Sequence, residues 1–355
     1  MTLIGWRERL PYSARPPRSQ VPLASPMKRL RPRLAVLLPC LALGLGACLG
    51  PREEAAPAPS EGFTERTPAF SLLGRPLLYV PPSDAVQAGR EAELAEARAL
   101  WEADPRDEAN IVWYGRRLAY LGRYQEAIEV YSAGLELHPD SPRLLRHRGH
   151  RYISLRRFAQ ARQDLRRAAL LAAHLPYEIE PDGQPNEWNI PRTSLQGNIH
   201  YHLALAQYLD GDFAGAARDW RRCLEWGRND DNVVSSSYWL YLSLRRLGLD
   251  REAAAAVEPV SEDMDILENH GYQRLCLLFR GDLSLEELMA REESDGIQSA
   301  TLRYGLASWH LLNGERERAA EMLLQIVSED SWSAFGHIAA EADLARLGFA
   351  LLARD

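Results

Sequence analysis

The sequence predicts an all-α fold, a solenoid of helix-turn-helix units stacked side by side. Three observations support it: no stretch shows the alternation of a half-buried strand, similar segments recur along the chain, and each carries small residues at matching places. Small side chains are needed where two antiparallel helices cross closely, and each pair leaves an apolar face that the next must cover. We expect about five to six helical pairs, one loop insertion and a C-terminal capping helix.

The recurrence has a period of 34 residues in its two clearest units. The segments GRYQEAIEVYSAGLELHPD and RRFAQARQDLRRAALLAAH align with Ala127 over Ala161, and Gly115 has the same offset from Gly149. A period of 34 is that of the tetratricopeptide repeat. Five residues of the first unit resemble the pattern of that repeat: Gly115, Ala127, Tyr131, Gly134 and Pro139. The resemblance implies small residues at the helix crossings and a proline that ends the second helix.

The array extends upstream of this unit by one partial repeat. Pro105 stands 34 residues before Pro139, so 92–103 is predicted to be the second helix of an incomplete pair. Together these units form a predicted N-terminal array over 86–175. Downstream, the turn signatures around Gly211, Gly248, Gly281 and Gly314 predict a C-terminal array over 198–352. Its last helix, at 333–347, would cap the solenoid.

An insertion at 176–197 separates the two arrays. Its sequence contains the turn signal Pro181-Asp182-Gly183, and Pro185 and Pro191 exclude a regular helix. Two interpretations remain open at this point. The segment is either a lid across a binding surface, with Trp188 as its anchor, or a structural plug over an exposed helix pair.

The second half of the chain also resembles the NlpI-type tetratricopeptide lipoproteins. The segments YWLYLSLRRLG, LFRGDLSLEELMAR and YGLASWHLLNGERERAAEMLLQIV follow the helix order of that family over 198–347. Proteins of that family act as periplasmic adaptors for a protease and for peptidoglycan hydrolases, so the resemblance implies an adaptor role here. The chain departs from the family at the insertion, and the identity of a partner does not carry over.

The N-terminal region predicts export and a lipid anchor. Basic residues precede a short apolar run at 34–45, which is too short to span a bilayer and has the layout of a signal peptide over 27–47. The sequence Leu-Gly-Ala-Cys at 45–48 resembles a bacterial lipobox, which implies lipidation of Cys48; an ordinary secretory signal is the alternative. Residues 48–85 are predicted to be a disordered tether. Residues 1–26 fit neither a signal nor a domain, so we expect translation from Met27. The expected location is the bacterial cell envelope.

Charge and cysteine content narrow the function classes. Residues 1–47 carry eight basic side chains and one acidic one, so the rest of the chain has a formal charge of −14. Such an acidic chain is a poor candidate for nucleic-acid binding. Contact with a membrane is expected through the lipid anchor only. Cys223 and Cys276 stand among apolar helix positions, where buried free thiols are commoner than a disulfide, although a bridge stays open.

A concave surface formed by the first helix of each pair is the predicted binding site. Its groove-facing side chains are expected to be Arg116, Arg143, Arg146, His150, Asn198, Tyr201, His202 and Tyr238. Arginines on one surface of an acidic protein favour a protein or peptide partner that is acidic or has a free C-terminal carboxylate. The alternative is a merely solvated face. The sequence leaves a homodimer open.

No catalytic, cofactor or metal signature stands out. His147 and His150 can share a helix face, whereas His200 and His202 cannot, and no ligand partner stands at zinc-like spacing. We therefore expect no enzyme activity, no metal and no cofactor. The rival hypothesis is an envelope enzyme whose active site lies under the insertion, with Glu180 and Asp182 as the first candidates for acid–base chemistry.

Overall fold

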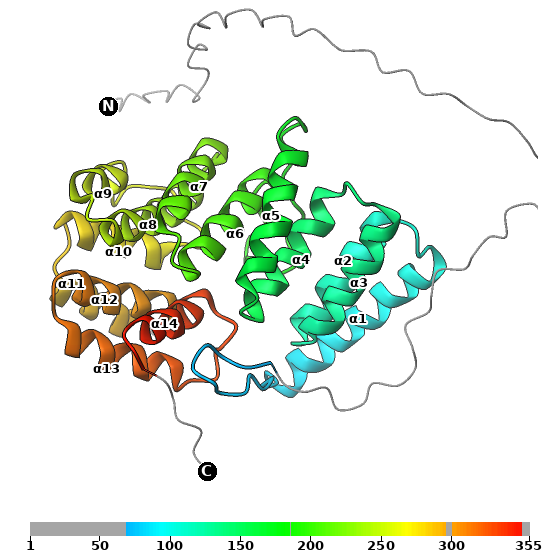
Figure 1. Ribbon diagram of the computed structural model, residues 1–355, viewed down its shortest axis with the longest axis horizontal. Coiled ribbons are helices and arrows are strands. Elements are labelled where there is room, and N and C mark those ends of the chain that lie inside the picture. Colours follow the sequence, from blue (N-terminus) through cyan, green and yellow to red (C-terminus); the bar gives the residue numbers. More distant parts are fainter. Residues whose placement is uncertain (1–68, 185, 296–299, 350–355) are drawn as a thin grey trace, which may run out of the picture. The chain divides into compact units, whose positions relative to one another are not determined.

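The computed structural model describes residues 69–184, 186–295 and 300–349, all within the unit Ala56–Asp355. Within these ranges it contains fourteen α-helices, and its only β structure is two isolated bridges (Figure 1). The helices are α1 (Asp84–Ala103), α2 (Glu108–Tyr120), α3 (Tyr124–Leu137), α4 (Pro142–Ser154), α5 (Phe158–Ala172), α6 (Leu195–Leu209), α7 (Phe213–Trp226), α8 (Asp230–Arg246), α9 (Asp250–Val257), α10 (His270–Arg280), α11 (Leu285–Asp295), α12 (Ala300–Leu312), α13 (Arg316–Val327) and α14 (Phe335–Arg346).

Helices α2 to α13 form six consecutive pairs, preceded by α1 and followed by α14. This confirms the predicted all-helical solenoid. None of the described helices is long and apolar enough to cross a bilayer. The predictions for 1–26, the signal peptide at 27–47 and the lipid on Cys48 concern residues outside the described ranges.

The small residues of the repeat lie where expected, at the crossings between helices. A Cβ added to Gly115 would lie 2.3 Å from the ring of Tyr131, and one added to Gly149 would lie 2.7 Å from Cγ of Leu165. Ala161 has no exposed surface. Helix starts are set by side-chain caps, because Asp107, Ser141 and Ser194 each accept a hydrogen bond from a backbone N–H of the first turn. The local sequence therefore fixes both the helix boundaries and the close packing.

The largest apolar cluster lies in the second half of the described chain. The indole rings of Trp220 and Trp239 stack with centroids 6.0 Å apart, and Tyr208 packs edge-on against Trp239. Cys223 and Cys276 are buried free thiols in the same cluster, so they are not bridged. Burial raises the pKa of the Cys223 thiol to about 11, which keeps it protonated at neutral pH.

Helix α14 lies where the sequence predicts a cap at 333–347, but it is more than a cap. Residues 336–344 are all buried, which is the pattern of a helix covered on every side. Phe335, at its start, packs against His150 of α4 and against Tyr201 and His202 of α6, with ring centroids 5.4–6.2 Å apart. The C-terminal helix therefore occupies space that an open groove along α6 would need.

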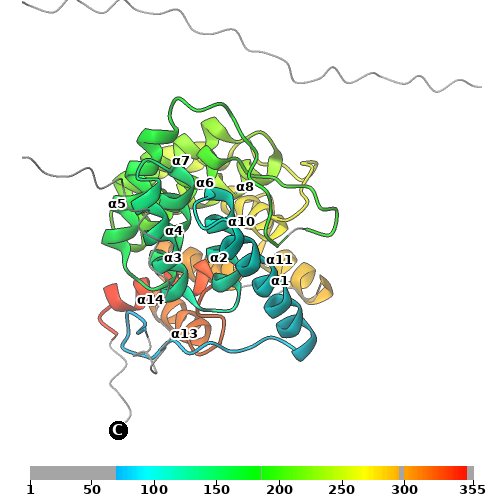
Figure 2. The same ribbon diagram turned by 90° about the vertical axis from the view of Figure 1, so that its right-hand side faces the viewer.

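The predicted tether at 48–85 is wrong for its described part, because residues 72–78 contact the C-terminal helices and residues 84–85 begin α1 (Figures 1 and 2). Leu73 and Leu77 are buried, and the backbone N–H of Leu72 donates to Oε2 of Glu341 at 3.1 Å. The side chain of Arg75 donates to the carbonyl of Val327 at 2.8 Å. Burial of the two leucines and these polar contacts order a segment that the proline-rich composition alone assigns to a linker.

The connection between α5 and α6 covers 173–194 rather than the predicted 176–197, because Ser194 caps α6 and starts it early. Within it, Ile179 and Ser194 form an isolated antiparallel bridge, and the N–H of Glu180 donates to the carbonyl of Thr193 at 3.0 Å. We call residues 173–194 the insertion segment. It folds back on itself beside the first helices of the N-terminal pairs.

Candidate functional site

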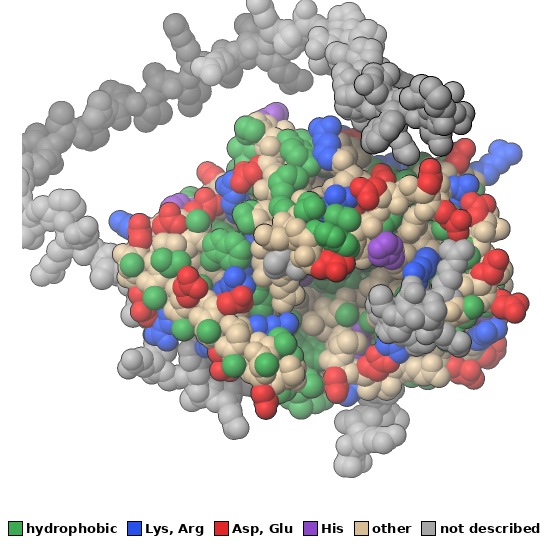
Figure 3. Space-filling model, turned by 180° about the vertical axis from the view of Figure 1, so that it is seen from behind, with side chains coloured by type: hydrophobic (Ala, Val, Ile, Leu, Met, Phe, Trp, Pro, Cys, Tyr) green, Lys and Arg blue, Asp and Glu red, His purple; other side chains and the backbone are tan. Residues whose placement is uncertain are grey.

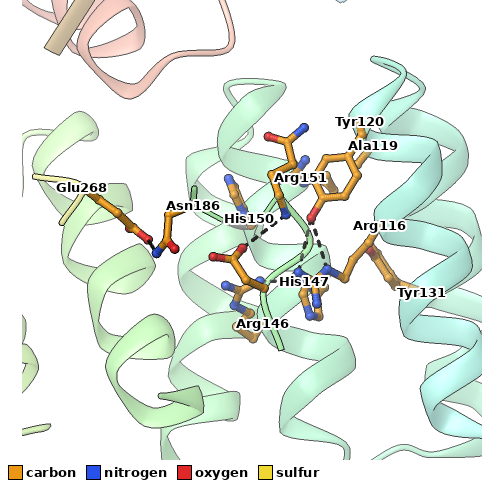
Figure 4. A pocket seen from close by; sticks show the side chains of 12 residues that line it. Arg116, Ala119, Tyr120, Tyr131, Arg146, His147, His150, Arg151, Asn186 and Glu268 are labelled. Carbon is orange, nitrogen blue, oxygen red and sulfur yellow. Dashed lines mark hydrogen bonds between the residues drawn. The ribbon is translucent and has the colours of Figure 1, made fainter. Parts of the chain in front are cut away.

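A cavity of about 440 Å³ lies between α2, α4 and the insertion segment (Figure 4). One wall carries six polar or basic side chains from the first helices of two pairs: Arg116, Tyr120, Arg146, His147, His150 and Arg151. The other wall is formed by Asp182, Gln184 and Asn186 of the insertion segment and by Glu268. A second space of about 220 Å³, beneath residues 180–182, shares Arg116, Arg146 and His147. We call the larger space the α2–α4 cavity.

Helical spacing explains why these side chains converge. Arg116 and Tyr120 are four residues apart in α2, and so are the pairs Arg146 with His150 and His147 with Arg151 in α4. Residues at that spacing lie on one face, one turn apart. Gly115 packs against Tyr131 of α3 and Gly149 against Leu165 of α5, so α2 and α4 each pack closely on the second helix of their own pair and present their remaining faces to the same cavity. The cavity thus follows from the repeat itself.

Carboxylates and carbonyls of the insertion segment contact the arginines. Arg143 pairs with Glu178, and Nη2 of Arg146 lies 3.4 Å from Oε2 of Glu180. Nη1 of Arg116 donates to the carbonyl of Pro181 at 3.0 Å. Glu180 is additionally held by Nδ2 of Asn198, which also donates to Thr193 Oγ1 at 3.0 Å. The chain therefore supplies its own acidic ligand to the predicted basic surface.

The electrostatics of the cavity are unusual for an acidic protein. Burial lowers the pKa of the Arg146 guanidinium; Glu180 opposes this shift, whereas the charges of Arg116 and Arg151 add to it. Burial also holds the pKa values of His147 and His150 well below their ordinary value, so both are neutral, and Nη1 of Arg146 can donate to Nδ1 of His147 at 2.8 Å. Nε of Arg146 is buried without a hydrogen-bond partner. The wall formed by α2 and α4 therefore concentrates positive charge.

The outer surface has no such concentration on the face shown in Figure 3, where acidic and basic side chains are interspersed. The contrast matters because arginines with little access to water interact with carboxylates more strongly than exposed ones do. The hypothesis of a merely solvated face therefore does not fit Arg146, whose side chain is 12% exposed. Arg143, whose side chain is 36% exposed, stands at the edge of the site.

The predicted groove does not continue past Asn198, and this corrects the sequence prediction. Tyr201 is packed in the core, where its hydroxyl lies 3.1 Å from that of Tyr272 and accepts from Nε1 of Trp239 at 3.2 Å. His202 is buried and neutral beside His150, with ring centroids 4.2 Å apart. Tyr238 has no exposed surface. The reason is that helices later in the chain, among them α14 and α10, cover the faces of α6 and α8 that the repeat pattern leaves open.

The predicted anchor Trp188 is half exposed, and it is not among the residues that line the cavity. Sequence reasoning also missed Arg151 and Tyr120, although their spacing of four from His147 and Arg116 was a usable signal. It missed Glu268, which reaches the site from the connection before α10 and accepts a hydrogen bond from Asn186. No pattern in the sequence links that distant connection to the repeat.

The positions of Glu180 and Asp182 do not favour the rival enzyme hypothesis. Glu180 is bound by Asn198 and Arg146, and Asp182 is exposed, so the two carboxylates serve separate contacts. Among the residues that the structure places, no group of three histidine, cysteine or acidic side chains could hold a metal ion. The wall formed by α2 and α4 is suited to binding an anionic group, since its polar groups include guanidinium donors and neutral imidazoles.

Comparison with known proteins supports the repeat assignment. The sequence pattern of the tetratricopeptide repeat matches residues 108–151, which run from α2 to α4 and include the basic wall of the cavity. This chain therefore contains a tetratricopeptide repeat at its candidate site. Among proteins with curated descriptions, none matches the chain.

Several solved structures are similar to the chain, including the following three. YrrB, described as a TPR protein with an unusual peptide-binding site, has 15% identity and a TM-score of 0.37 over 69% of this chain and 95% of its own. A tetratricopeptide repeat protein from Parabacteroides merdae has 17% identity and a TM-score of 0.43 over 72% of this chain and 94% of its own. The Naa15/Naa10 complex bound to HypK-THB has 15% identity and a TM-score of 0.34 over 72% of this chain and 37% of the matched chain.

Proposed function

We propose that this protein is a lipid-anchored scaffold of the bacterial cell envelope that binds an acidic segment of a partner protein in the α2–α4 cavity. The observation that carries the proposal is the placement of Arg116, Arg143 and Arg146 on the first helices of two repeat pairs, each in contact with a carboxylate or carbonyl. Solenoids use the concave surface of such helices to bind extended partners. Guanidinium groups bind carboxylates with charge-assisted hydrogen bonds.

Selectivity follows from the charge of the rest of the chain. With a formal charge of −14 from residue 48 onward, the protein repels acidic partners except where arginines gather. A partner segment rich in carboxylates, or one that ends in a free C-terminal carboxylate, would match the positive charge of Arg116, Arg143 and Arg146. The arginines attract an acidic partner at this surface while the net negative charge of the chain repels it elsewhere, so binding is restricted to this one surface.

A pulldown tests the binding site. Arg146 is too buried for replacement by glutamate, so the double variant Arg143→Gln with Arg146→Gln removes both charges at nearly constant volume. Loss of charge-assisted hydrogen bonds costs about 1.5–3 kcal/mol each, so capture of the partner from an envelope extract should fall at least tenfold. Arg166→Gln, an exposed position on α5, is the matched control. Circular dichroism checks the fold, and an unchanged partner set with the double variant would refute the site.

The envelope anchor rests on the Leu-Gly-Ala-Cys sequence at 45–48, and it is tested separately. Acylation requires a thiol, so Cys48→Ser should release the protein from the membrane fraction and abolish incorporation of labelled palmitate. Labelling that survives the substitution would remove the lipid anchor from the proposal and leave the binding site untouched.

A further inference from the structure

Residues 176–184 of the insertion segment lie over the basic wall, with the side chain of Glu180 turned inward and those of Glu178 and Asp182 exposed. The carboxylate of Glu180 is buried, with 9% of the residue exposed, while its neighbour Ile179 faces outward and is 38% exposed. Trp188 and Ile190, further along the segment, are 50% and 46% exposed. A structural plug would bury its apolar side chains and leave its charges in water. In this segment, by contrast, the carboxylate of Glu180 is buried against the arginines while Ile179 beside it is partly exposed.

Polar contacts hold residues 178–183 to the basic wall. Glu178 pairs with Arg143 and Glu180 with Arg146, and the carbonyls of Pro181 and Gly183 accept from Arg116 and Arg117. Water or another carboxylate can replace each of these partners. Displacement of residues 178–182 would uncover little apolar surface, because Ile179, their one large aliphatic side chain, is already 38% exposed.

Both ends of the segment are attached elsewhere. Tyr177 stacks on Trp226, with ring centroids 6.5 Å apart, and Arg192 pairs with the buried Asp231 at 3.0 Å. Between these ends, displacement of the central residues from the arginines must also break the bridge of Ile179 with Ser194 and the hydrogen bond from Asn198 to Glu180. The cavity of about 440 Å³ that remains beside them gives an incoming chain a place to begin contact.

We infer that residues 178–182 are an internal stand-in for the partner, and that the site selects an extended segment with carboxylates at alternate positions, which must displace them. This inference rests on the proposed function and specifies the partner chemistry. Glu178, Glu180 and Asp182 alternate along an extended stretch, so side chains of the first two reach Arg143 and Arg146 together. A partner with the same alternation competes for the same guanidinium groups, so only one of the two segments can occupy them.

The test uses the full chain and a labelled synthetic peptide with the sequence of residues 176–184, PYEIEPDGQ. Wild type is compared with the double variant Glu178→Gln and Glu180→Gln, which weakens the internal ligand while keeping its shape. Glu187→Gln, an exposed carboxylate of the same segment, is the matched control. A peptide with glutamine in place of both glutamates controls for the charge of the ligand.

The double variant should bind the labelled peptide at least tenfold more tightly than wild type or Glu187→Gln, since a tethered competitor reduces apparent affinity. Unlabelled peptide at saturation should also speed hydrogen exchange at the amides of Glu180 and Leu195, which bond within the segment. The glutamine peptide should bind none of the three proteins measurably.

Two results would overturn the inference. Equal affinity of wild type and the double variant would show that the internal segment does not compete. Failure of the double variant to bind the peptide would show that alternate carboxylates are not what the site selects. Neither result decides the proposed function, because the pulldown with Arg143→Gln and Arg146→Gln tests it without this peptide.

Discussion

Removal of one partner of the buried ion pair between Arg156 and Glu341 should cost more stability than any surface substitution. Arg156 lies in the turn between α4 and α5, and Glu341 lies in α14. Their side chains are 3% and 1% exposed, and Nε of Arg156 lies 2.9 Å from Oε2 of Glu341. The same carboxylate accepts from Leu72 and faces His337 at 3.3 Å. One group thus joins the N-terminal segment, an early repeat and the last helix.

The magnitude follows from what each substitution leaves behind. Arg156→Met removes the guanidinium and leaves a buried carboxylate, for which the expected loss is about 3–5 kcal/mol of the free energy of unfolding. That loss is a large share of the free energy of unfolding of a typical domain, which is roughly 5–15 kcal/mol. Glu341→Met leaves a buried guanidinium instead. In the double variant neither charge is stranded, so its loss should be smaller than the sum of the two single losses by about 2 kcal/mol or more.

Urea unfolding at pH 7 measures these values. Circular dichroism and tryptophan fluorescence should give coincident transitions if the array unfolds as one unit. A loss below about 1 kcal/mol for Arg156→Met, or strict additivity of the two substitutions, would refute the idea that α14 is fixed into the array by this pair.

Two further perturbations test the packing and the buried histidines. Gly336→Ala should destabilise the protein by about 1–3 kcal/mol, because the added Cβ would lie 2.3 Å from the backbone oxygen of Ala300. The control Gly89→Ala in α1 places a Cβ that meets nothing within 4 Å, so it should stabilise the protein by about 0.4–1 kcal/mol. Equal effects of the two substitutions in urea unfolding would contradict the placement of α14. Acid should destabilise the protein below about pH 6.5, because three buried histidines with lowered pKa values stay neutral in the fold while the unfolded chain takes up protons: His147, His150 and His202. Each can contribute up to about 1.4 kcal/mol per pH unit. Glu341, whose pKa is lowered by its hydrogen bonds from His337 and Arg156 against the effect of burial, adds its loss only below about pH 4.5. A melting temperature that is the same at pH 7.5 and pH 5.5 would show that these histidines do not resist protonation.

The sequence could predict the features that recur with the repeat. The crossing at Gly149 and Ala161 and the inward direction of Arg116 and Arg146 all follow from a period of 34 and from helical spacing. These features depend on neighbours in the chain, which a periodic pattern describes well. The carboxylates at 178 and 180 were visible too, but their pairing with arginines across the cavity needs the fold.

The sequence could not predict which repeat faces become buried, because this depends on the geometry with which successive helical pairs stack. Small rotations between successive pairs decide whether the last helix lies beyond the array or within it. Tyr238 and His202 are therefore buried although their repeat positions point to a concave surface. The same packing buries residues 336–344 on every side and covers Leu73 and Leu77, which do not belong to the repeat.

Photo-crosslinking in intact cells tests the central claim most directly, since it asks what occupies the α2–α4 cavity. A photoreactive phenylalanine derivative in place of Tyr120, which lines the cavity, closely matches the side chain it replaces. The same derivative at Leu170, a highly exposed position on α5, is the control. Mass spectrometry should identify, from position 120 only, a peptide with carboxylates at alternate positions, and Arg143→Gln with Arg146→Gln should abolish that adduct. Adducts that are the same from both positions, or that survive the double substitution, would contradict the account.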